Sequence, residues 1–518
     1  LNDHAAVVRS LSAAVSLEPN FLPAYVNLGS AYEKLGDPNK AIEIWKIAVG
    51  RPVTAGPTTV GYLTTLYKQI ARVYADLMMP DMAEQAVVQC LALAPHHKDA
   101  MEQYVAFRLA QCKWPSVEPI DTLDAVSIVE TMHPLSAAVY TDDPLLQLAT
   151  AERYVRKTCS KTAAPGPNDR RAAPVDLTSR RLRIGYVSSD LRDHAVGYLM
   201  AELFERHDRN AVEVFAYYCG IPSQSELTLR TKAAIEHWRE IRDLSNEAAA
   251  AMIAKDGIDI LVDVNGHTRD AKLGIFALRP APIQVNWLGF PGSMGSPFHQ
   301  YIIADDWVIP QGSEKYYSER VMRLPCYQPN DRRRQVDATP SRAAFGLPEN
   351  AFVYCCFNGT HKISRFSFER WMRIMREVPN SVLWLLDAQA SVQDRIRNMA
   401  TSLGVDGSRI IFTPRVKNSM HLARYPLADA FLDTAPYGAH TTASDALWMG
   451  VPVVTFSGRG FASRVCGGLV RAAGAPELVA DSPEGFVEIA VELGRDPARA
   501  KALSRRLLEM RWTSTLFD

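Results

Sequence analysis

Four short polar segments hold most of the side chains of this chain that could take part in chemistry. They span residues 188–194, 263–268, 358–362 and 438–442, and each follows an apolar run typical of a strand. A lone histidine is more often structural than catalytic, but loops along one edge of a rigid sheet are where sites are built. The segments are therefore considered together. Their candidate side chains are Asp190, His194, Asp263, His267, Asn358, Lys362, His440, Thr441 and Thr442.

The last segment has the pattern of a phosphate-binding helix start. Thr441 or Thr442 would be a good N-cap for a helix that Gly450 ends. The unpaired N–H groups and partial positive charge of a helix N-terminus suit a phosphate. His440 adds a neutral donor, and Asp445, one turn into the helix, could accept a hydrogen bond from a ribose hydroxyl. An ordinary strand, loop and helix whose threonines only cap the helix fits the same local pattern.

Several motifs of other enzyme classes are absent. No G-x-G-x-x-G follows the first expected strand and no P-loop occurs, which counts against a dinucleotide-cofactor enzyme. Without H-E-x-x-H or D-x-D, no metal that would hold a diphosphate is evident, and we expect neither a metal nor a cofactor. A leaving diphosphate would then be stabilised by Lys362 and by the N–H groups and hydroxyls of Thr441 and Thr442. A lysine taken in isolation is more often an exposed surface residue.

Strand-like and helical segments alternate from residue 182 onward, which predicts two doubly wound, Rossmann-like α/β lobes. Ligands bind at the carboxyl ends of the strands in such sheets, so the cleft between the lobes is the expected site for a nucleotide-linked substrate. We expect a long helix ending near Lys255 and a helical tail over residues 482–510. The expected strands lie at 182–189, 212–218, 258–264, 283–289, 352–357, 382–386, 410–412, 427–433 and 453–456.

The N-terminal part carries an internal repeat. The pattern Tyr-x2-Leu-Gly-x2-Tyr at residues 25–32 returns as Tyr-x2-Ile-Ala-x2-Tyr at residues 67–74, which is typical of tetratricopeptide repeats. The copies are 42 residues apart instead of about 34, so we expect an insertion near residues 49–59. Stacked helix pairs form a concave groove, which predicts a peptide-binding all-α superhelix. The predicted domains are repeats (1–115), helical connector and linker (116–179), first lobe (180–340) and second lobe (341–518).

Composition is that of a globular protein and excludes some partners. Lysine plus arginine and aspartate plus glutamate each number 57 in 518 residues, so no global field favours nucleic acid. The cluster Arg332–Arg334 is interpreted as a solvated face or loop tip. No apolar run of about 18 residues predicts a membrane span. Eight cysteines without C-x-x-C spacing and the lack of a signal-peptide pattern predict reduced thiols and a cytoplasmic location.

Together with the repeats, four blocks closely resemble the O-linked N-acetylglucosamine transferases, in particular a bacterial form with few repeats. The blocks are residues 183–194 (RIGYVSSDLRDH), 276–292 (FALRPAPIQVNWLGFPG), 379–386 (PNSVLWLL) and 432–442 (LDTAPYGAHTT). The resemblance covers nearly the whole chain. It implies the two-lobed GT-B arrangement, UDP-N-acetylglucosamine as donor, inversion at the sugar, and serine or threonine hydroxyls of proteins as acceptors bound through the repeat groove.

The resemblance also implies roles for individual residues. His194 matches a histidine at the sugar and acceptor, with Asp190, Asp263 and a donor phosphate oxygen as rival bases. Gly359 and His361 stand where the animal enzymes have Gln and Tyr, so part of the donor contact differs. Other matches are Lys362 at the diphosphate, His421 at the uracil, His440, Thr441 and Thr442 in the phosphate turn, Asp445 at the ribose, His267 in an active-site loop, and Asn358 and Lys417 among the donor-binding candidates.

Three other functions remain open at this stage. A related transferase could use another nucleotide sugar, such as GDP-fucose, on the same fold. A repeat scaffold with an inactive nucleotide lobe would bind peptides without transferring sugar. A sugar-nucleotide epimerase also has two such sheets, but it does not need a peptide-binding repeat arm.

Overall fold

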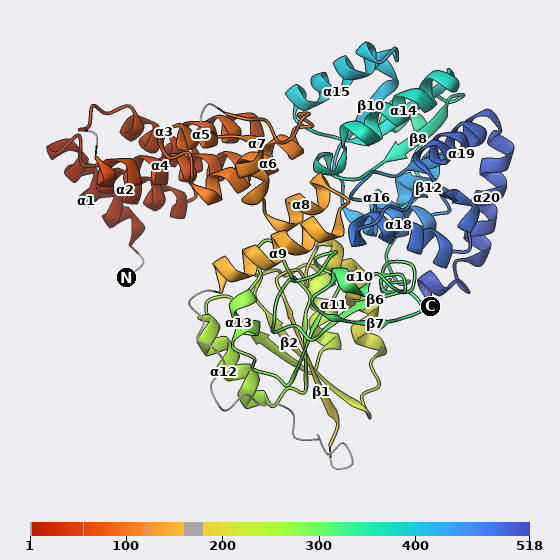
Figure 1. The fold of residues 1–518 in the computed structure, drawn as a ribbon, viewed down its shortest axis with the longest axis horizontal. Coiled ribbons are helices and arrows are strands. Elements are labelled where there is room, and N and C mark those ends of the chain that lie inside the picture. The colour runs from red at the N-terminus through yellow and green to blue at the C-terminus, as the bar shows by residue number, and fades with distance from the viewer. Residues whose placement is uncertain (1–2, 55, 121–122, 160–179) are drawn as a thin grey trace. The chain divides into compact units, whose positions relative to one another are not determined.

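The computed structural model describes residues 3–54, 56–120, 123–159 and 180–518 (Figure 1). The chain divides into two compact units, one formed by Leu1–Met132 with Ala388–Gln393 and the other by His133–Asp387 with Asp394–Asp518. The predicted linker at residues 161–179 lies outside the described residues. None of the described helices is both long enough and apolar enough to cross a membrane.

The first unit is built from helices that pack in sequence order. Most positions of the repeat pattern are buried, although Tyr32 and Tyr67 are half-buried, and Trp45 is fully enclosed. A Cβ on Gly29 would lie 2.3 Å from Trp45 Cε2, so only glycine lets the two helices approach this closely. The predicted insertion falls between α3 and α4. The helices are α1 (His4–Leu17), α2 (Leu22–Lys34), α3 (Pro38–Val49), α4 (Pro57–Asp76), α5 (Pro80–Leu93), α6 (Lys98–Ala110) and α7 (Ala125–Glu130).

The predicted connector is shared between the two units. α7 belongs to the first unit, whereas α8 (Pro134–Tyr140) and α9 (Pro144–Thr158) belong to the second. Proline at the first position of α8 and of α9 suits a helix start, because its missing N–H has no partner there in any helix. The second unit therefore comprises both α/β lobes and the last two connector helices.

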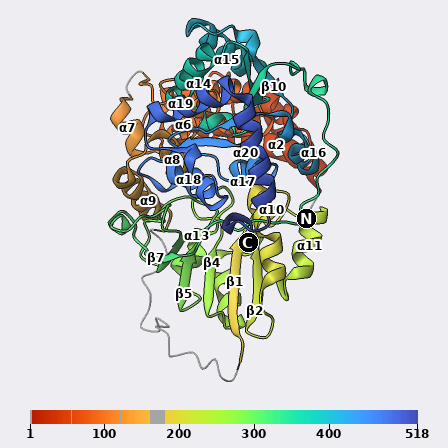
Figure 2. The same cartoon turned by 90° about the vertical axis from the view of Figure 1, so that its right-hand side faces the viewer.

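The first lobe contains a parallel sheet of seven strands in the order β3-β2-β1-β4-β5-β6-β7. Val187 pairs with Asp263 across β1 and β4, so the polar segments that follow these strands leave the same sheet edge (Figure 2). The strands are β1 (Leu182–Ser188), β2 (Val212–Tyr218), β3 (His237–Glu240), β4 (Ile260–Asp263), β5 (Ile283–Asn286), β6 (Tyr301–Ala304) and β7 (Arg320–Arg323).

One element predicted for this lobe is wrong. The single long helix expected to end near Lys255 is two helices, α11 (Glu226–Ala234) and α12 (Asn246–Asp256), with β3 between them. β3 is a polar edge strand with half-buried or exposed side chains, so it carries no apolar signature. The other helices of the lobe are α10 (Ala195–Arg206) and α13 (Leu273–Ala277).

The second lobe repeats the plan with six parallel strands in the order β10-β9-β8-β11-β12-β13. The expected helical tail is two helices, which break at Asp496 and Pro497. The strands are β8 (Phe352–Cys356), β9 (Ser381–Leu386), β10 (Ile410–Thr413), β11 (Ala430–Leu432), β12 (Val453–Phe456) and β13 (Val479–Ala480). The helices are α14 (Arg365–Glu377), α15 (Ala390–Ser402), α16 (Asn418–Arg424), α17 (Thr441–Trp448), α18 (Phe461–Ala472), α19 (Pro483–Arg495) and α20 (Pro497–Met510).

Candidate active site

A cavity of about 440 Å³ lies between the two lobes, at the carboxyl ends of both sheets. All four predicted polar segments reach it, and the segment 263–268 does so only through Thr268. Lys362 and Thr441 line this same cavity, as the predicted diphosphate site requires. The other predicted residues in its wall are Asp190, His194, Asn358, His440 and Thr442.

Asp433, at the end of β11, organises the turn that enters α17. Its Oδ1 accepts hydrogen bonds from the backbone N–H of Thr434 at 2.7 Å and of Ala439 at 2.6 Å. Its Oδ2 accepts from Thr455 Oγ1 at 2.6 Å. Burial raises the pKa of the Asp433 carboxyl, while these donors oppose the rise. No local sequence pattern indicates this role of Asp433, because its partners include backbone groups of the turn itself.

α17 begins at Thr441 with His440 as the preceding residue, and His440 makes no side-chain cap. The prediction that a threonine caps this helix is therefore wrong by one position. Thr442 Oγ1 instead donates to Asn358 Oδ1 at 2.5 Å, and Asn358 Nδ2 donates to Thr434 Oγ1 at 2.7 Å. The amide of Asn358 thus ties the loop after β8 to the turn after β11. The start of α17 keeps the N–H groups of its first turn directed out of the helix, next to the cavity.

Lys362 is held against the same turn. Its Nζ donates to the Gly438 carbonyl at 3.0 Å and lies 3.9 Å from the centroid of the Tyr437 ring. Burial lowers the pKa of Lys362 to about 8, and the nearby Asp433 opposes that shift. Because this value is above 7, the ammonium group carries its charge at neutral pH. An anion bound in the cavity would stabilise that charge further.

His440 stacks on Tyr437, with ring centroids 4.9 Å apart. Its Nε2 donates to the carbonyl of Ala462 at 3.1 Å, since a carbonyl can only accept. Burial holds the pKa of His440 well below its usual value, so the ring is neutral and Nδ1 is an acceptor. The N–H expected to serve a phosphate is therefore used inside the protein.

On the opposite wall, His194 precedes α10 and caps it. His194 Nδ1 accepts from the backbone N–H of Val196 at 3.3 Å and lies 3.8 Å from Asp190 Oδ1. With Nδ1 accepting, the neutral ring carries its proton on Nε2, which makes that nitrogen a donor. Desolvation lowers the pKa of His194, and the Asp190 carboxylate opposes the shift. The side chain is 42% exposed, so it has room to meet a ligand.

Asn265 joins the first two polar segments. Its Nδ2 donates to Asp190 Oδ2 at 2.9 Å, and its Oδ1 accepts from the N–H of Ser189 at 2.7 Å. Asp190 Oδ1 has longer contacts, to Arg192 at 3.7 Å as well as to His194. Asn265 thus holds one oxygen of Asp190, while the other oxygen lies near Arg192 and His194 in the cavity wall.

Two other acid–base candidates lie behind the wall. Asp263 is 2% exposed and accepts from the N–H groups of Asn265 and Gly266 and from His299 Nε2 at 3.2 Å. His267 is also 2% exposed, and its Nε2 donates to the carbonyl of Met294 at 2.9 Å. Burial lowers the pKa of His267 to about 3. Neither side chain lines the cavity, and the catalytic role expected of His267 stays a prediction.

Asp445 lies one helical turn into α17, and His421 of α16 lies beside it. Asp445 is 3% exposed and forms an ion pair with Arg334, which is only 8% exposed. The interpretation of Arg332–Arg334 as a solvated cluster is therefore wrong for Arg334, whose partner lies 111 residues away along the chain. His421 Nε2 is 3.9 Å from Asp445 Oδ2, and burial lowers the pKa of His421 to about 3. The ribose-binding role of Asp445 stays a prediction.

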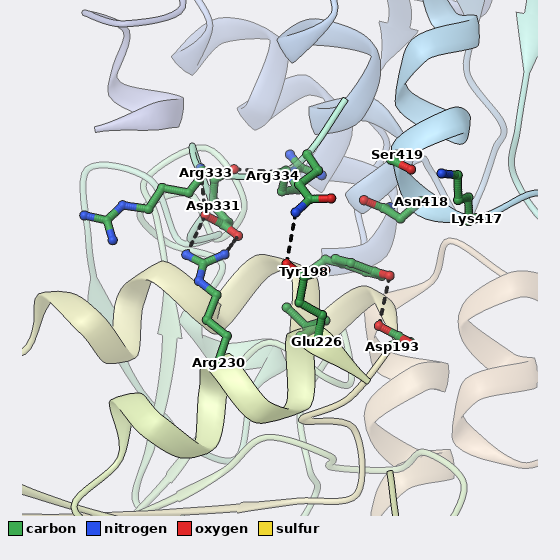
Figure 3. Close-up of a pocket in the computed structure, with 12 residues that line it drawn as sticks. Asp193, Tyr198, Glu226, Arg230, Asp331, Arg333, Arg334, Lys417, Asn418 and Ser419 are labelled. Carbon is green, nitrogen blue, oxygen red and sulfur yellow. Dashed lines mark hydrogen bonds and ion pairs between the residues drawn. The ribbon is translucent and has the colours of Figure 1, made fainter. Parts of the chain in front are cut away.

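A second cavity of about 400 Å³ borders this region (Figure 3). It is lined by charged residues of both lobes, and Arg230 and Asp331 point toward each other in its wall. Lys417 lies here and not in the first cavity, with Nζ 3.0 Å from Asp337 and a side chain that is 72% exposed. The predicted donor-binding residues are thus divided between two neighbouring regions.

Among the described residues, no group of three or more His, Cys, Asp or Glu side chains is placed to hold a metal ion. The expectation that the protein needs no metal stays a prediction.

Two doubly wound parallel sheets with a polar cavity between their carboxyl ends define a two-lobed α/β protein of the kind that binds nucleotide-linked ligands. The family model for glycosyl transferase family 41 matches residues 129–330 and 327–518, and the chain belongs to that family. A tetratricopeptide-repeat model matches residues 22–45, within α2 and α3.

Relatives and a solved structure agree with this assignment. The chain is 36% identical over 406 residues to a probable UDP-N-acetylglucosamine–peptide N-acetylglucosaminyltransferase from Arabidopsis thaliana, covering 76% of this chain and 42% of the relative. It is 30% identical over 453 residues to the Caenorhabditis elegans UDP-N-acetylglucosamine–peptide N-acetylglucosaminyltransferase, covering 65% of this chain and 39% of that protein. The chain thus spans about two fifths of the length of these curated relatives.

A mutant O-GlcNAc transferase from Thermobaculum terrenum has a similar structure, with a TM-score of 0.73 and 29% identity. The match covers 99% of this chain and 91% of that one. The predicted fold, two Rossmann-like lobes preceded by repeat helices, is confirmed.

Proposed function

We propose that the protein transfers N-acetylglucosamine from UDP-N-acetylglucosamine to serine or threonine hydroxyls of proteins, with inversion at the sugar. The observation that carries the proposal is the shared cavity of Lys362 and the start of α17. One ammonium group and one helix N-terminus face the space where a diphosphate would leave. Membership of family 41 and the activities in the names of the relatives support the same reaction.

Charge develops on the diphosphate as the bond to the sugar breaks, and the donor side stabilises it. Lys362 supplies a full positive charge, and the first N–H groups of α17 with Thr441 supply oriented dipoles. These groups are fixed by Asp433 and Asn358 before any ligand arrives, so little reorganisation accompanies the reaction. No step of this mechanism requires a metal ion.

The acceptor hydroxyl attacks from the side of the first lobe. His194 presents Nε2–H as a donor, so its role is to orient the sugar or the acceptor and not to remove the proton in this tautomer. Asp190 Oδ1 is the base we favour within the protein, and a donor phosphate oxygen is its rival. Asp263 is excluded from that role by its burial and its three hydrogen-bond donors.

The repeat helices bind the acceptor polypeptide, as stacked helix pairs do in other repeat proteins. We also propose a cytoplasmic location for the protein, because eight cysteines without C-x-x-C spacing are typical of reduced thiols.

Labelled UDP-N-acetylglucosamine incubated with the protein and a cell lysate tests the proposal, with label on protein as the readout. GDP-fucose is run in parallel, and Lys362→Met serves as the control variant. We expect label from the UDP sugar only, and none with the variant. Label transferred from GDP-fucose alone would show that the donor is GDP-fucose. Nucleotide binding without any transfer would favour a peptide-binding scaffold with an inactive nucleotide lobe.

A further inference from the structure

The loop between α8 and α9 contacts the second lobe through one carboxylate, Asp142. Asp142 Oδ2 accepts from the backbone N–H of Arg459 at 2.7 Å, and Oδ1 accepts from the N–H of Gly460 at 2.8 Å. Ser463 Oγ lies 2.6 Å from Oδ1 and donates to it. Asp142 and these partners are more than 300 residues apart in the sequence.

The Asp142 carboxylate acts as the N-terminal cap that α18 lacks. Gly460 precedes the helix and has no side chain, so α18 makes no side-chain cap of its own. A capping carboxylate satisfies free N–H groups and complements the positive end of the helix dipole. Asp142 therefore fixes the first turn of α18 from another part of the chain.

The first turn of α18 in turn holds the phosphate turn. The carbonyl of Ala462 accepts from the backbone N–H of Gly438 at 3.1 Å and from His440 Nε2 at 3.1 Å. The carbonyl of Gly438 accepts from Lys362 Nζ. Asp142 is thus linked to the lysine and histidine of the donor cavity by two sets of hydrogen bonds, which the backbone of the first turn of α18 joins.

Gly458 lies directly against the Asp142 carboxylate and leaves no room for a side chain. A Cβ on Gly458 would lie 2.0 Å from Asp142 Oδ2 and 2.8 Å from Ser463 Oγ, so any larger residue would displace the carboxylate. The φ angle of Gly458 is not in the left-handed region, so backbone strain does not demand glycine there. Glycine is needed only for the approach of Asp142.

We propose that Asp142 is a positioning residue of the donor site, which acts through α18 on Gly438, His440 and Lys362. The proposal rests on the proposed function for its effect on catalysis, but its structural part does not. The connector helices α8 and α9 are on this view a component of the catalytic unit, since the donor turn depends on a carboxylate between them.

Amide hydrogen exchange on the full chain tests the structural part without any ligand. In Asp142→Ala, the amides of Gly438 and Ala439 should exchange at least several-fold faster than in the unmodified protein, because the carbonyl of Ala462 no longer holds the N–H of Gly438 in place. Asp143→Ala is the matched control: Asp143 caps α9 at Leu145 and Leu146 and does not touch α18. Unchanged exchange at Gly438 and Ala439 in Asp142→Ala, or an equal rise in Asp143→Ala, would overturn the proposal.

Kinetics test the functional part. Asp142→Ala should raise KM for the donor and lower kcat, together about tenfold or more in kcat/KM, because misplacing a catalytic group by about 1 Å can cost a hundredfold. KM for the acceptor should not change, and Asp142→Asn, which keeps an accepting oxygen, should recover part of the loss. An unchanged KM for the donor, together with faster amide exchange, would show that Asp142 stabilises the structure but does not position the donor site.

A double-mutant cycle with Gly458→Ala identifies the contact responsible. Gly458→Ala alone should reproduce the Asp142→Ala defect, and adding it to Asp142→Ala should cost little more. Additive losses would show that the two residues act separately. If the unmodified protein binds neither UDP nor UDP-N-acetylglucosamine by calorimetry, the proposed function fails, and the exchange result alone then decides the role of Asp142.

Discussion

The two walls of the active-site cavity hold their polar groups in different ways. On the second lobe, Asp433 and Asn358 hold the phosphate turn by hydrogen bonds of 2.5 to 2.7 Å, and Lys362 is fixed against its backbone. On the first lobe, His194 has a backbone contact of 3.3 Å and a carboxylate at 3.8 Å. The second-lobe side of the cavity, here called the donor wall, is held by short hydrogen bonds within the protein. The first-lobe side, here called the acceptor wall, is held by longer contacts, so its side chains can still form hydrogen bonds with a ligand.

This difference follows from what each wall must do. A diphosphate is the same in every catalytic cycle, so fixed dipoles can be aimed at it in advance. Acceptor hydroxyls belong to different polypeptides, so the groups that meet them need freedom to adjust. Variants on the donor wall should therefore affect the chemical step, and variants on the acceptor wall should affect how the acceptor is placed.

The largest effect is expected from Lys362→Met on the donor wall. Turnover should fall by roughly 10² to 10³, because the lost charge stabilises the leaving group most strongly in the transition state. Affinity for UDP, measured by calorimetry, should fall much less. Equal losses in turnover and affinity would mean that the lysine only binds the nucleotide.

His194→Ala tests the acceptor wall. Donor binding should survive, while transfer falls by about 10², since the oriented Nε2–H donor is removed. His194→Gln restores a donor at a similar distance and should recover part of the rate. Loss of UDP binding in a calorimetric titration of His194→Ala would instead assign this histidine to the nucleotide.

The difference between the walls also sets what the sequence could reveal. The strand at 212–218 and the repeat helix at 25–32 are predicted correctly, because hydrophobic periodicity and small residues at helix contacts are local signals. Lys362, Thr441 and Thr442 were brought together for the same reason: they follow strands that end at one sheet edge.

The contacts that position these residues carried no local signal. Arg334 pairs with Asp445 across 111 residues, and Asp142 reaches α18 across more than 300, so no spacing rule applies. Charged residues near one another in sequence are usually solvated, which is why the sequence predicts an exposed Arg334 although this residue is buried. The prediction missed β3 for a related reason, since a polar edge strand lacks the alternation of apolar residues that indicates a strand.

The pH dependence of catalysis sharpens the account of the donor wall. The pKa of Lys362 is about 8, so the ammonium group is charged below that pH and loses its proton above it. kcat/KM should therefore fall above pH 8, approaching tenfold per pH unit. In Lys362→Arg the guanidinium does not titrate in this range, and the decline should disappear even if the rate is lower. A decline that persists in Lys362→Arg would place the titrating group elsewhere.

The smallest effect is expected from Lys417→Ala, which tests whether the second cavity belongs to the donor wall. The Lys417 side chain is 72% exposed and pairs with Asp337 at the protein surface, where such pairs contribute roughly 0 to 1 kcal/mol. UDP affinity and turnover should change by less than about twofold, since screening by solvent weakens any attraction to a nucleotide. Arg334 lines the same cavity but is buried and paired with Asp445, so Arg334→Met should weaken UDP binding far more. If Lys417→Ala lowered UDP affinity tenfold or more, the nucleotide would extend into the second cavity and the fixed donor wall would be larger than the turn around Thr441.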